Sequence, residues 1–157
     1  MRLEYFQLID RIIDLNLADR KISSEALVPS ASTIFEGHFP GYPLMPGVLL
    51  IEAMAQTSGW LVIAANKFER VPFLASVKEA KLRTFITPGE ALTVDAQLMH
   101  EGSGYAVSKA KISAKGKPVC DATLTLRVMD FPNAQMEAEM RKIASRIGLA
   151  LEAPVNG

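Results

Sequence analysis

One short segment of the chain gathers residue types that can do acid–base chemistry. Residues 37–47, GHFPGYPLMPG, place the imidazole of His38 in a loop stiffened by proline and glycine. An apolar segment begins at Gly47, and the free N–H groups and dipole of such a helix start favour a developing negative charge. Glu52 and Gln56 follow, one helical turn apart on the same face. The segment therefore offers a base, an anion-stabilising helix end and an acid.

Each of these residues also has an ordinary structural explanation. An isolated histidine in a loop is usually a polar surface residue, and an isolated glutamate in an apolar helix can pair with an arginine. We favour the functional interpretation because all the groups occur together around one helix start. We expect Glu52 to be buried in the apolar helix, where a carboxyl group is suited to act as a general acid.

The helix that positions Glu52 is predicted over residues 47–65, GVLLIEAMAQTSGWLVIAA. This segment is about as long as a membrane span. Glu52 and Gln56 stand in its middle, however, where hydrocarbon would penalise a charged side chain by roughly a few kcal/mol. A helix that is apolar nearly all round, with one polar stripe, is better interpreted as the buried helix of a soluble protein.

The rest of the chain alternates between apolar and polar residues with a period of two, which predicts strands. Short turns containing glycine, proline or lysine separate the later runs, and short turns join antiparallel neighbours. The pattern predicts an α+β domain in which an antiparallel sheet packs on the long helix. The predicted strands cover residues 20–28, 73–83, 92–98, 104–114 and 120–128.

The two ends of the chain are predicted to be helical in part. Residues 3–14 fit a short helix that runs into a strand, and residues 133–150 fit an amphipathic helix. We therefore divide the chain into a domain over residues 1–132 and a C-terminal helical extension and tail over residues 133–157. The last residues, 153–157, are expected to form a loose tail.

Composition excludes several other classes of function. The chain has 157 residues, with 17 Lys+Arg against 17 Asp+Glu, and a general nucleic-acid binder needs a basic excess. The single cysteine, Cys120, excludes an internal disulfide and is expected to be an inert core thiol. Neither a metal-ligand spacing nor a nucleotide-binding glycine motif is present, so we expect no metal and no cofactor. The N-terminus is unlike a signal peptide, and we expect a cytoplasmic protein.

The segment GHFPGYPLMPGVLLIEAMAQ resembles the signature of the FabZ-type β-hydroxyacyl-acyl carrier protein dehydratases. Three further segments, FQLIDRI, FLASVKEAKLRTFITPGE and GKPVCDATLTLRV, are also similar to that family, so the likeness covers residues 5–128. The resemblance implies a hotdog fold, in which an antiparallel sheet wraps around a long central helix. It also implies a homodimer or a trimer of dimers.

The resemblance implies a lyase that removes water from a (3R)-3-hydroxyacyl chain on acyl carrier protein and leaves the trans-2-enoyl thioester. His38 matches the base that takes the C2 proton, and Glu52 matches the acid that protonates the C3 hydroxyl. The N–H of Gly47 matches the group that binds the thioester carbonyl. Gln56 matches the residue that supports Glu52, and Phe39 would line an acyl tunnel. In this family the histidine and the glutamate of one site come from different subunits.

Two segments depart from the family pattern. Residues 2–5 replace a His-Arg-x-Pro sequence that can touch the dimer interface or the tunnel mouth, and the C-terminal helix extends beyond the usual end. The segments LEYFQLIDRI and EGSGYAVSKAKI are similar to accessory dehydratases of alphaproteobacteria, which serve very long hydroxyacyl chains of lipid A.

Two other functions remain as alternatives, a hotdog acyl thioesterase and a non-catalytic acyl-binding protein. Hotdog thioesterases do not share the pair formed by His38 and Glu52, and an intact pair weighs against a binding protein. Bifunctional dehydratase-isomerases resemble the chain too, but they carry aspartate at the position of Glu52, so we expect no isomerase activity.

A basic run, Lys78, Lys81 and Arg83, has two interpretations of equal weight. It is either a solvated strand face or a docking patch for the acidic carrier protein, since opposite charges steer encounter. Simple alternation along a strand would place Lys81 and Arg83 on one face and Lys78 on the other.

Overall fold

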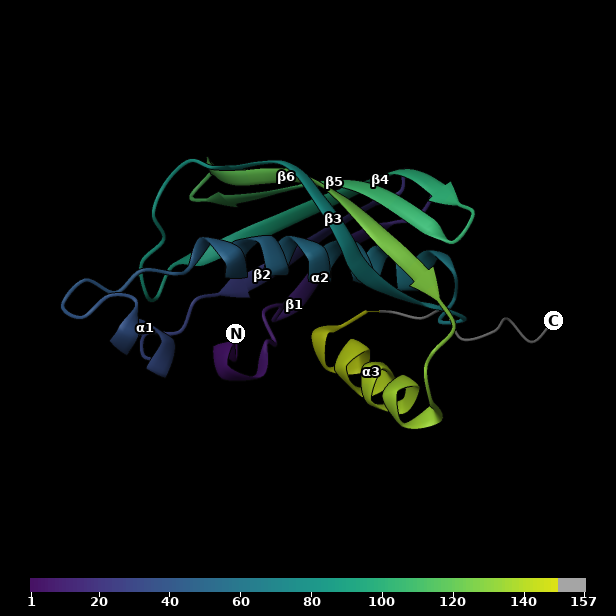
Figure 1. Ribbon diagram of the computed structural model, residues 1–157, viewed down its shortest axis with the longest axis horizontal. Helices are drawn as coiled ribbons and strands as arrows, with labels where there is room; N and C mark the ends of the chain where they lie inside the picture. Colours follow the sequence, from purple (N-terminus) through teal and green to yellow (C-terminus); the bar gives the residue numbers. More distant parts are fainter. Residues whose placement is uncertain (150–157) are drawn as a thin grey trace.

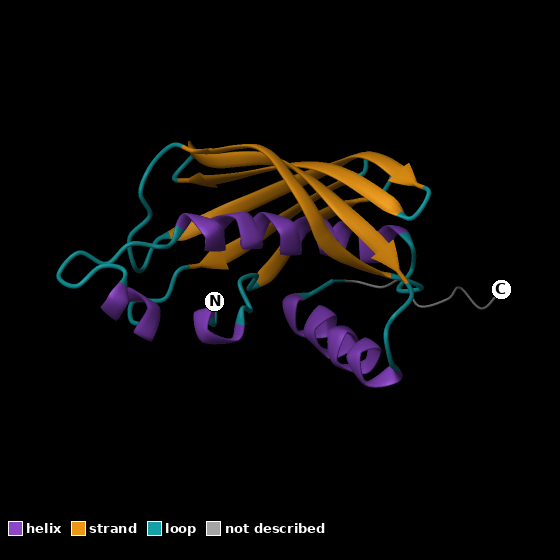
Figure 2. Cartoon of the chain, viewed as in Figure 1, coloured by secondary structure: helices purple, strands orange, loops and turns teal. Residues whose placement is uncertain are grey.

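The long apolar segment forms one helix, α2 (Gly47–Ala65), and the sheet arches over it (Figures 1 and 2). The computed structural model describes residues 1–149. The sheet has the strand order β1-β2-β4-β5-β6-β3, and every pair of neighbours is antiparallel. The strands are β1 (Arg11–Asn16), β2 (Lys21–Leu27), β3 (Val71–Leu82), β4 (Ala91–Gly102), β5 (Tyr105–Ala114) and β6 (Lys117–Met129).

Three short or peripheral helices complete the fold: a 3-10 turn, η1 (Leu3–Tyr5), and the helices α1 (Thr33–Gly37) and α3 (Ala134–Ile147). The α+β hotdog fold with an extra C-terminal helix is thus confirmed, and so is the helix-to-strand start. The division at residue 132 stays a prediction, and the expected tail, residues 153–157, lies outside the described residues.

Helix α1 was not predicted, and its last two residues fall in the segment 36–47, where the glycines and prolines predicted an irregular loop. Ser32 precedes this helix, and its Oγ accepts a hydrogen bond from the N–H of Ile34 at 3.1 Å. That side-chain cap starts about one turn of helix, and the helix ends at Gly37, the first glycine of the loop segment. The irregular loop is therefore shorter than predicted, and it begins at His38.

Helix α2 is apolar on nearly every side because protein surrounds it on nearly every side. By length and composition it could cross a membrane, with a mean hydropathy of 1.6, but 67% of its most apolar stretch is buried within the chain. Ala53, Met54, Leu61 and Val62 are fully buried there. The burial agrees with the prediction of a core helix.

Two buried pairs of hydroxyl groups join α2 to the sheet. Ser58 Oγ lies 2.6 Å from Ser108 Oγ on β5, and Thr57 Oγ1 lies 2.7 Å from Ser24 Oγ on β2. All four side chains are inaccessible to solvent. Because each hydroxyl would be costly to bury without a partner, these pairs favour a single register of the helix on the sheet.

Helix α3 packs on the side of the fold opposite the arch of the sheet (Figure 1). Ala144 and Ile147 are buried, and the Arg141 guanidinium lies 4.5 Å from the ring centroid of Phe68. The ring of Phe131 stacks on the same Phe68, with the two ring centroids 6.3 Å apart. The predicted amphipathic helix is therefore a docked part of the described structure.

The edge strand β3 contains two irregularities, and one of them corrects the predicted facing of the basic run. Lys78 pairs with Thr123 and Lys81 with Asp121, so three residues of β3 oppose two of β6. Thr123 and Asp121 point to the same outer face of the sheet, and the bulge therefore places Lys78 and Lys81 on that face together. Simple alternation placed Lys78 and Lys81 on opposite faces, because the sequence pattern does not reveal the extra residue that the bulge inserts between them.

The hydroxyl pair on β5 yields a test of how α2 is held. We expect Ser58→Ala or Ser108→Ala alone to lower the free energy of unfolding by about 1–3 kcal/mol, because each leaves one buried hydroxyl unpaired. The double variant should lose clearly less than the sum of the two. Urea denaturation of the four proteins measures this coupling, and strictly additive losses would contradict it.

Candidate active site

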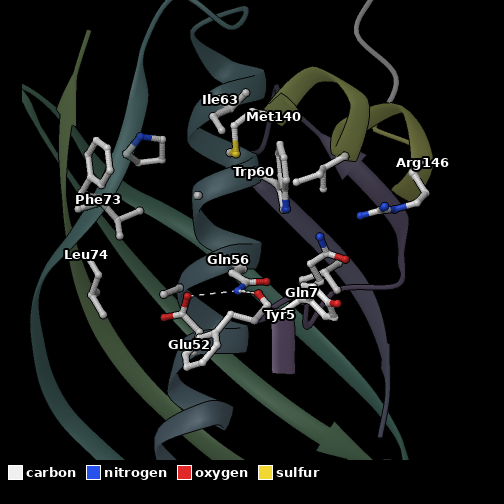
Figure 3. Close-up of a pocket in the computed structure, with 17 residues that line it drawn as sticks. Tyr5, Gln7, Glu52, Gln56, Trp60, Ile63, Phe73, Leu74, Met140 and Arg146 are labelled. Carbon is white, nitrogen blue, oxygen red and sulfur yellow. Dashed lines mark hydrogen bonds between the residues drawn. The ribbon is translucent and has the colours of Figure 1, made fainter. Parts of the chain in front are cut away.

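A groove runs along the side of α2 that the sheet leaves open (Figure 3). Its volume is about 360 Å³. The α2 residues in its wall recur every three or four positions, which is one stripe of the helix. The N-terminal segment, the start of β3 and helix α3 form the other walls. The stripe on α2 consists of Glu52, Ala55, Gln56, Gly59, Trp60 and Ile63.

The polar end of the groove holds Glu52 and Gln56, which share one face of α2 as their spacing predicted. Gln56 Nε2 donates to Glu52 Oε1 at 3.2 Å and to the carbonyl oxygen of Phe6 at 2.6 Å. Gln56 Oε1 accepts from the N–H of Leu8 at 3.2 Å. One amide therefore ties the catalytic candidate Glu52 to the N-terminal segment, and both of its ends are used.

Glu52 itself is half-buried, whereas the sequence led us to expect a buried carboxylate. The reason lies in the groove, which leaves the Glu52 side of α2 open in a single chain. Figure 3 shows the carboxylate directed into the groove opposite Phe73 and Leu74 of the edge strand β3. A second chain against this edge would bury the group further.

His38 begins the loop that leads into α2, and backbone contacts fix its ring. Its Nδ1 lies 3.0 Å from the carbonyl oxygen of Leu44, and the N–H of Leu44 donates to the His38 carbonyl at 2.8 Å. Since a carbonyl only accepts, Nδ1 carries the proton in the neutral ring and Nε2 is left with its lone pair. The ring of Phe39 stacks on His38 at a centroid distance of 4.1 Å.

The loop between His38 and α2 turns tightly. Phe39 and Tyr42 exchange two backbone hydrogen bonds of 3.0 and 2.9 Å across the turn. Gly41 lies inside it with a φ of 76°, a conformation that other residues adopt at a cost. The turn and the two bonds to Leu44 hold the imidazole within the loop that precedes α2.

The start of α2 offers unoccupied amide donors. Its cap, Pro46, has no side chain that can accept a hydrogen bond, and its carbonyl accepts only from Leu49 and Leu50. Among residues 1–149, no acceptor faces the amides of Gly47 and Val48. A Cβ at Gly47 would meet Leu82 Cδ1 from β3, so the Leu82 side chain would have to move aside.

The structure brings some of the predicted site residues together and separates others. Glu52 and Gln56 are hydrogen-bonded, and His38 and Phe39 share the loop before Gly47. His38 and Phe39 are absent from the residues that line the groove around Glu52. Within one chain, the predicted base and the predicted acid therefore do not face one cavity.

The N-terminal segment that departs from the family pattern, residues 2–5, contacts both the start of α1 and the groove around Glu52. Glu4 accepts hydrogen bonds from Ser32 Oγ at 2.7 Å and from the N–H of Thr33 at 3.2 Å, at the start of α1. The Ser32 hydroxyl is the main cause that lowers the pKa of Glu4. Tyr5 lines the groove beside Gln56. The sequence could not show these contacts, because they join residues about 30 or more positions apart.

The remaining candidates lie elsewhere. Lys78, Lys81 and Arg83 are exposed, and Arg83 donates to Asp121 Oδ2 from Nε at 3.0 Å and from Nη2 at 2.7 Å.

Cys120 is buried, and burial raises the pKa of its thiol to about 11, which leaves it unreactive at neutral pH. No group of three His, Cys, Asp or Glu side chains among the described residues could hold a metal ion.

The three contacts of Gln56 generate a prediction about stability. We expect Gln56→Ala to lower the free energy of unfolding by about 1–3 kcal/mol, because the buried N–H of Leu8 loses its acceptor. Urea denaturation measures the loss. Gln97→Ala, at an exposed position on β4, is the matched control and should change stability little. Equal losses of unfolding free energy in the two variants would show that the hydrogen bonds of Gln56 do not stabilise the fold.

Comparisons with known proteins place these features in a family. A model of the FabA-like domain matches residues 2–123. The chain is 33% identical over 129 residues to the 3-hydroxyacyl-[acyl-carrier-protein] dehydratase FabZ of Listeria monocytogenes, covering 81% of this chain and 88% of that one. It is 39% identical over 130 residues to the bifunctional enzyme LpxC/FabZ of Chlorobaculum tepidum, covering 82% of this chain but only 28% of that enzyme.

A solved structure shows the same fold at lower identity. It is a hypothetical thioesterase from Streptococcus pneumoniae with coenzyme A, with a TM-score of 0.58 and 19% identity over 78% of this chain and 88% of that one. That likeness concerns the fold alone. The narrower similarity to accessory dehydratases of lipid A synthesis stays a prediction. The length and identity of the other matches show that the chain belongs to the FabA-like family and is related to its FabZ dehydratases.

Proposed function

We propose that the protein is a lyase that dehydrates (3R)-3-hydroxyacyl-[acyl carrier protein] to trans-2-enoyl-[acyl carrier protein] in fatty acid synthesis. The observation that carries the proposal is the Glu52 carboxylate, held by Gln56 at the polar end of an apolar groove. The relatives named FabZ support the same reaction. We place the reaction in the cytoplasm, and it requires no cofactor.

His38 is the base of the proposed reaction. Its Nδ1–H is held by the Leu44 carbonyl, so Nε2 takes a proton from C2 of the substrate. The electrons of the broken C–H bond move toward the thioester carbonyl, whose oxygen gains negative charge. The amide of Gly47 at the start of α2 donates to that oxygen, and the dipole of the helix stabilises the same charge.

Glu52 is the acid that completes the dehydration. It protonates the hydroxyl group on C3, the C3–O bond breaks, and water leaves as the C2–C3 double bond forms. The amide of Gln56 orients the carboxylate from one side only, so the other carboxylate oxygen stays available to the substrate. The resting state returns when His38 loses the proton taken from C2 and Glu52 regains one, either directly from His38 or through water.

Because the groove around Glu52 lacks His38, we propose that each site forms between two copies of the chain. The surface near the helix start supports this arrangement. Val48 and Phe85 are each 72% exposed, and the edge strand β3 exposes Phe73, Leu74, Val77 and Leu82. An apolar edge strand of this kind is normally covered by a partner. The smallest assembly that forms the site is a homodimer, and a trimer of dimers would preserve it.

We propose acyl carrier protein as the macromolecular partner, docking on a basic surface formed by Lys78 and Lys81. This surface lies on the outer face of β3, and the next residue, Leu82, lies over the start of α2, so the same strand reaches the proposed oxyanion site. Arg83 contributes less than the sequence suggested, because Asp121 compensates its charge. Local placement has to supply the attraction, since the chain has no net charge.

The catalytic assignment predicts the effect of removing each group. We expect His38→Ala and Glu52→Gln to lower the turnover of a hydroxyacyl carrier roughly a hundred- to ten-thousandfold each, because each removes one proton-transfer group. Turnover is followed at the enoyl absorbance. The matched controls, His100→Ala and Glu69→Gln, change the same residue types at exposed positions and should retain activity. Release of free thiol without enoyl formation would indicate a thioesterase instead.

The docking assignment predicts a difference between two substrates. We expect Lys78→Glu with Lys81→Glu to raise KM for the carrier-bound substrate several-fold, because exposed charges act mainly on association. A short pantetheine thioester lacks the acidic protein and should react as before. Lys67→Glu, just beyond the opposite end of α2, serves as the control. Equal losses on both substrates would assign these lysines to the fold or the tunnel.

A further inference from the structure

Helix α3 closes the apolar end of the groove that begins at Glu52. Met140, Ile143 and Arg146 project into the groove from one face of this helix, three residues apart. Figure 3 shows Met140 beside Ile63 at the end of the groove remote from Glu52. The charged pair on α3, Glu139 and Lys142, is exposed, and its two charged atoms are 3.0 Å apart.

The groove has the shape and lining of a channel for an extended alkyl chain. From Glu52 to Ile63 the stripe on α2 covers 12 residues, about 16 Å at the rise of a helix. Its floor is kept open by Ala55 and Gly59. Glycine inside a helix costs roughly 0.5–1 kcal/mol relative to alanine, so Gly59 keeps room in the groove at the expense of helix stability.

Helix α3 is also a feature of this chain beyond the family match. The FabA-like model matches residues 2–123, whereas α3 spans Ala134–Ile147. Its position is nevertheless defined by packing, through buried Ala144 and Ile147 and the contact of Arg141 with Phe68. A docked helix at the end of a substrate groove can set how much chain the groove accepts.

We propose that Met140 and Ile143 on α3 determine the acyl chain length that the enzyme accepts, by contacting the distal carbons of the bound chain. The inference rests on the proposed function, which places the reacting carbons at Glu52. The thioester then lies at the polar end of the groove, and the alkyl chain extends along Ala55, Gly59 and Trp60 toward α3. Chains that reach α3 gain apolar contact with it, and shorter chains do not.

The test compares hydroxyacyl thioesters of graded length. Met140→Trp and Ile143→Trp fill the end of the groove and should lower kcat/KM for long chains at least about tenfold relative to short chains, the scale on which apolar pockets discriminate by size. Met140→Ala enlarges the same end and should shift the preference toward longer chains. Lys142→Trp adds the same bulk on the exposed face of α3 and should leave the length profile unchanged.

A second readout does not depend on catalysis. Trp60 is the only tryptophan in the chain and lines the groove, so its fluorescence should respond to a long-chain enoyl thioester more strongly than to a short one. Met140→Ala adds no second tryptophan, so the signal still comes from Trp60 alone. This variant should change how the fluorescence response depends on acyl chain length. The proposal is overturned if Met140→Ala and both tryptophan variants keep the wild-type length profile. An absence of dehydration in wild type with an intact Trp60 response would instead overturn the proposed reaction.

Discussion

The positions of Glu52, Gln56 and the Gly47 amide depend on how α2 is held against the sheet. The sheet buries most of the helix, and the paired hydroxyls Ser58–Ser108 and Thr57–Ser24 favour one register between them. Hydrophobic packing alone would tolerate small rotations of a helix that is apolar on almost every side, because it is non-directional. With the register set, Glu52 and Gln56 face the groove, and the amides of Gly47 and Val48 in the first turn stay without an acceptor among the described residues.

The same placement explains why His38 and Glu52 do not face one cavity within a single chain. The groove at Glu52 opens beside the edge strand β3, and the imidazole lies in a loop outside that groove. Exposed apolar side chains around the helix start, such as Val48 and Phe85, mark the surface that a second copy would cover. Covering it would bury Glu52 more deeply and exclude water from the thioester, which strengthens every charge interaction there.

The sequence predicted the helices and strands whose apolar residues recur with a regular period. It did not predict irregular features, such as a bulge, or contacts between distant segments. The strands followed from periods of two, and α2 followed from a long apolar segment with one polar stripe. The bulge between Lys78 and Lys81 was invisible, because one extra residue shifts the facing of a strand without changing its composition. Glu52 and Gln56 could be paired from their spacing, whereas the contacts of Gln56 with Phe6 and Leu8 arise only when the N-terminal segment folds against α2. Likewise, the spacing of Met140 and Ile143 showed an apolar face but not the groove that it meets.

The central claim is that one site uses His38 from one subunit and Glu52 from its partner, and mixing two inactive variants tests it directly. His38→Ala and Glu52→Gln proteins are allowed to exchange subunits, and exchange is verified by mass spectrometry of the intact dimers. Half of the dimers are then mixed and each carries one intact site of two, so the account predicts recovery of about a quarter of wild-type dehydration. Verified exchange with no recovered dehydration would show that each site lies within one chain, and would contradict the account.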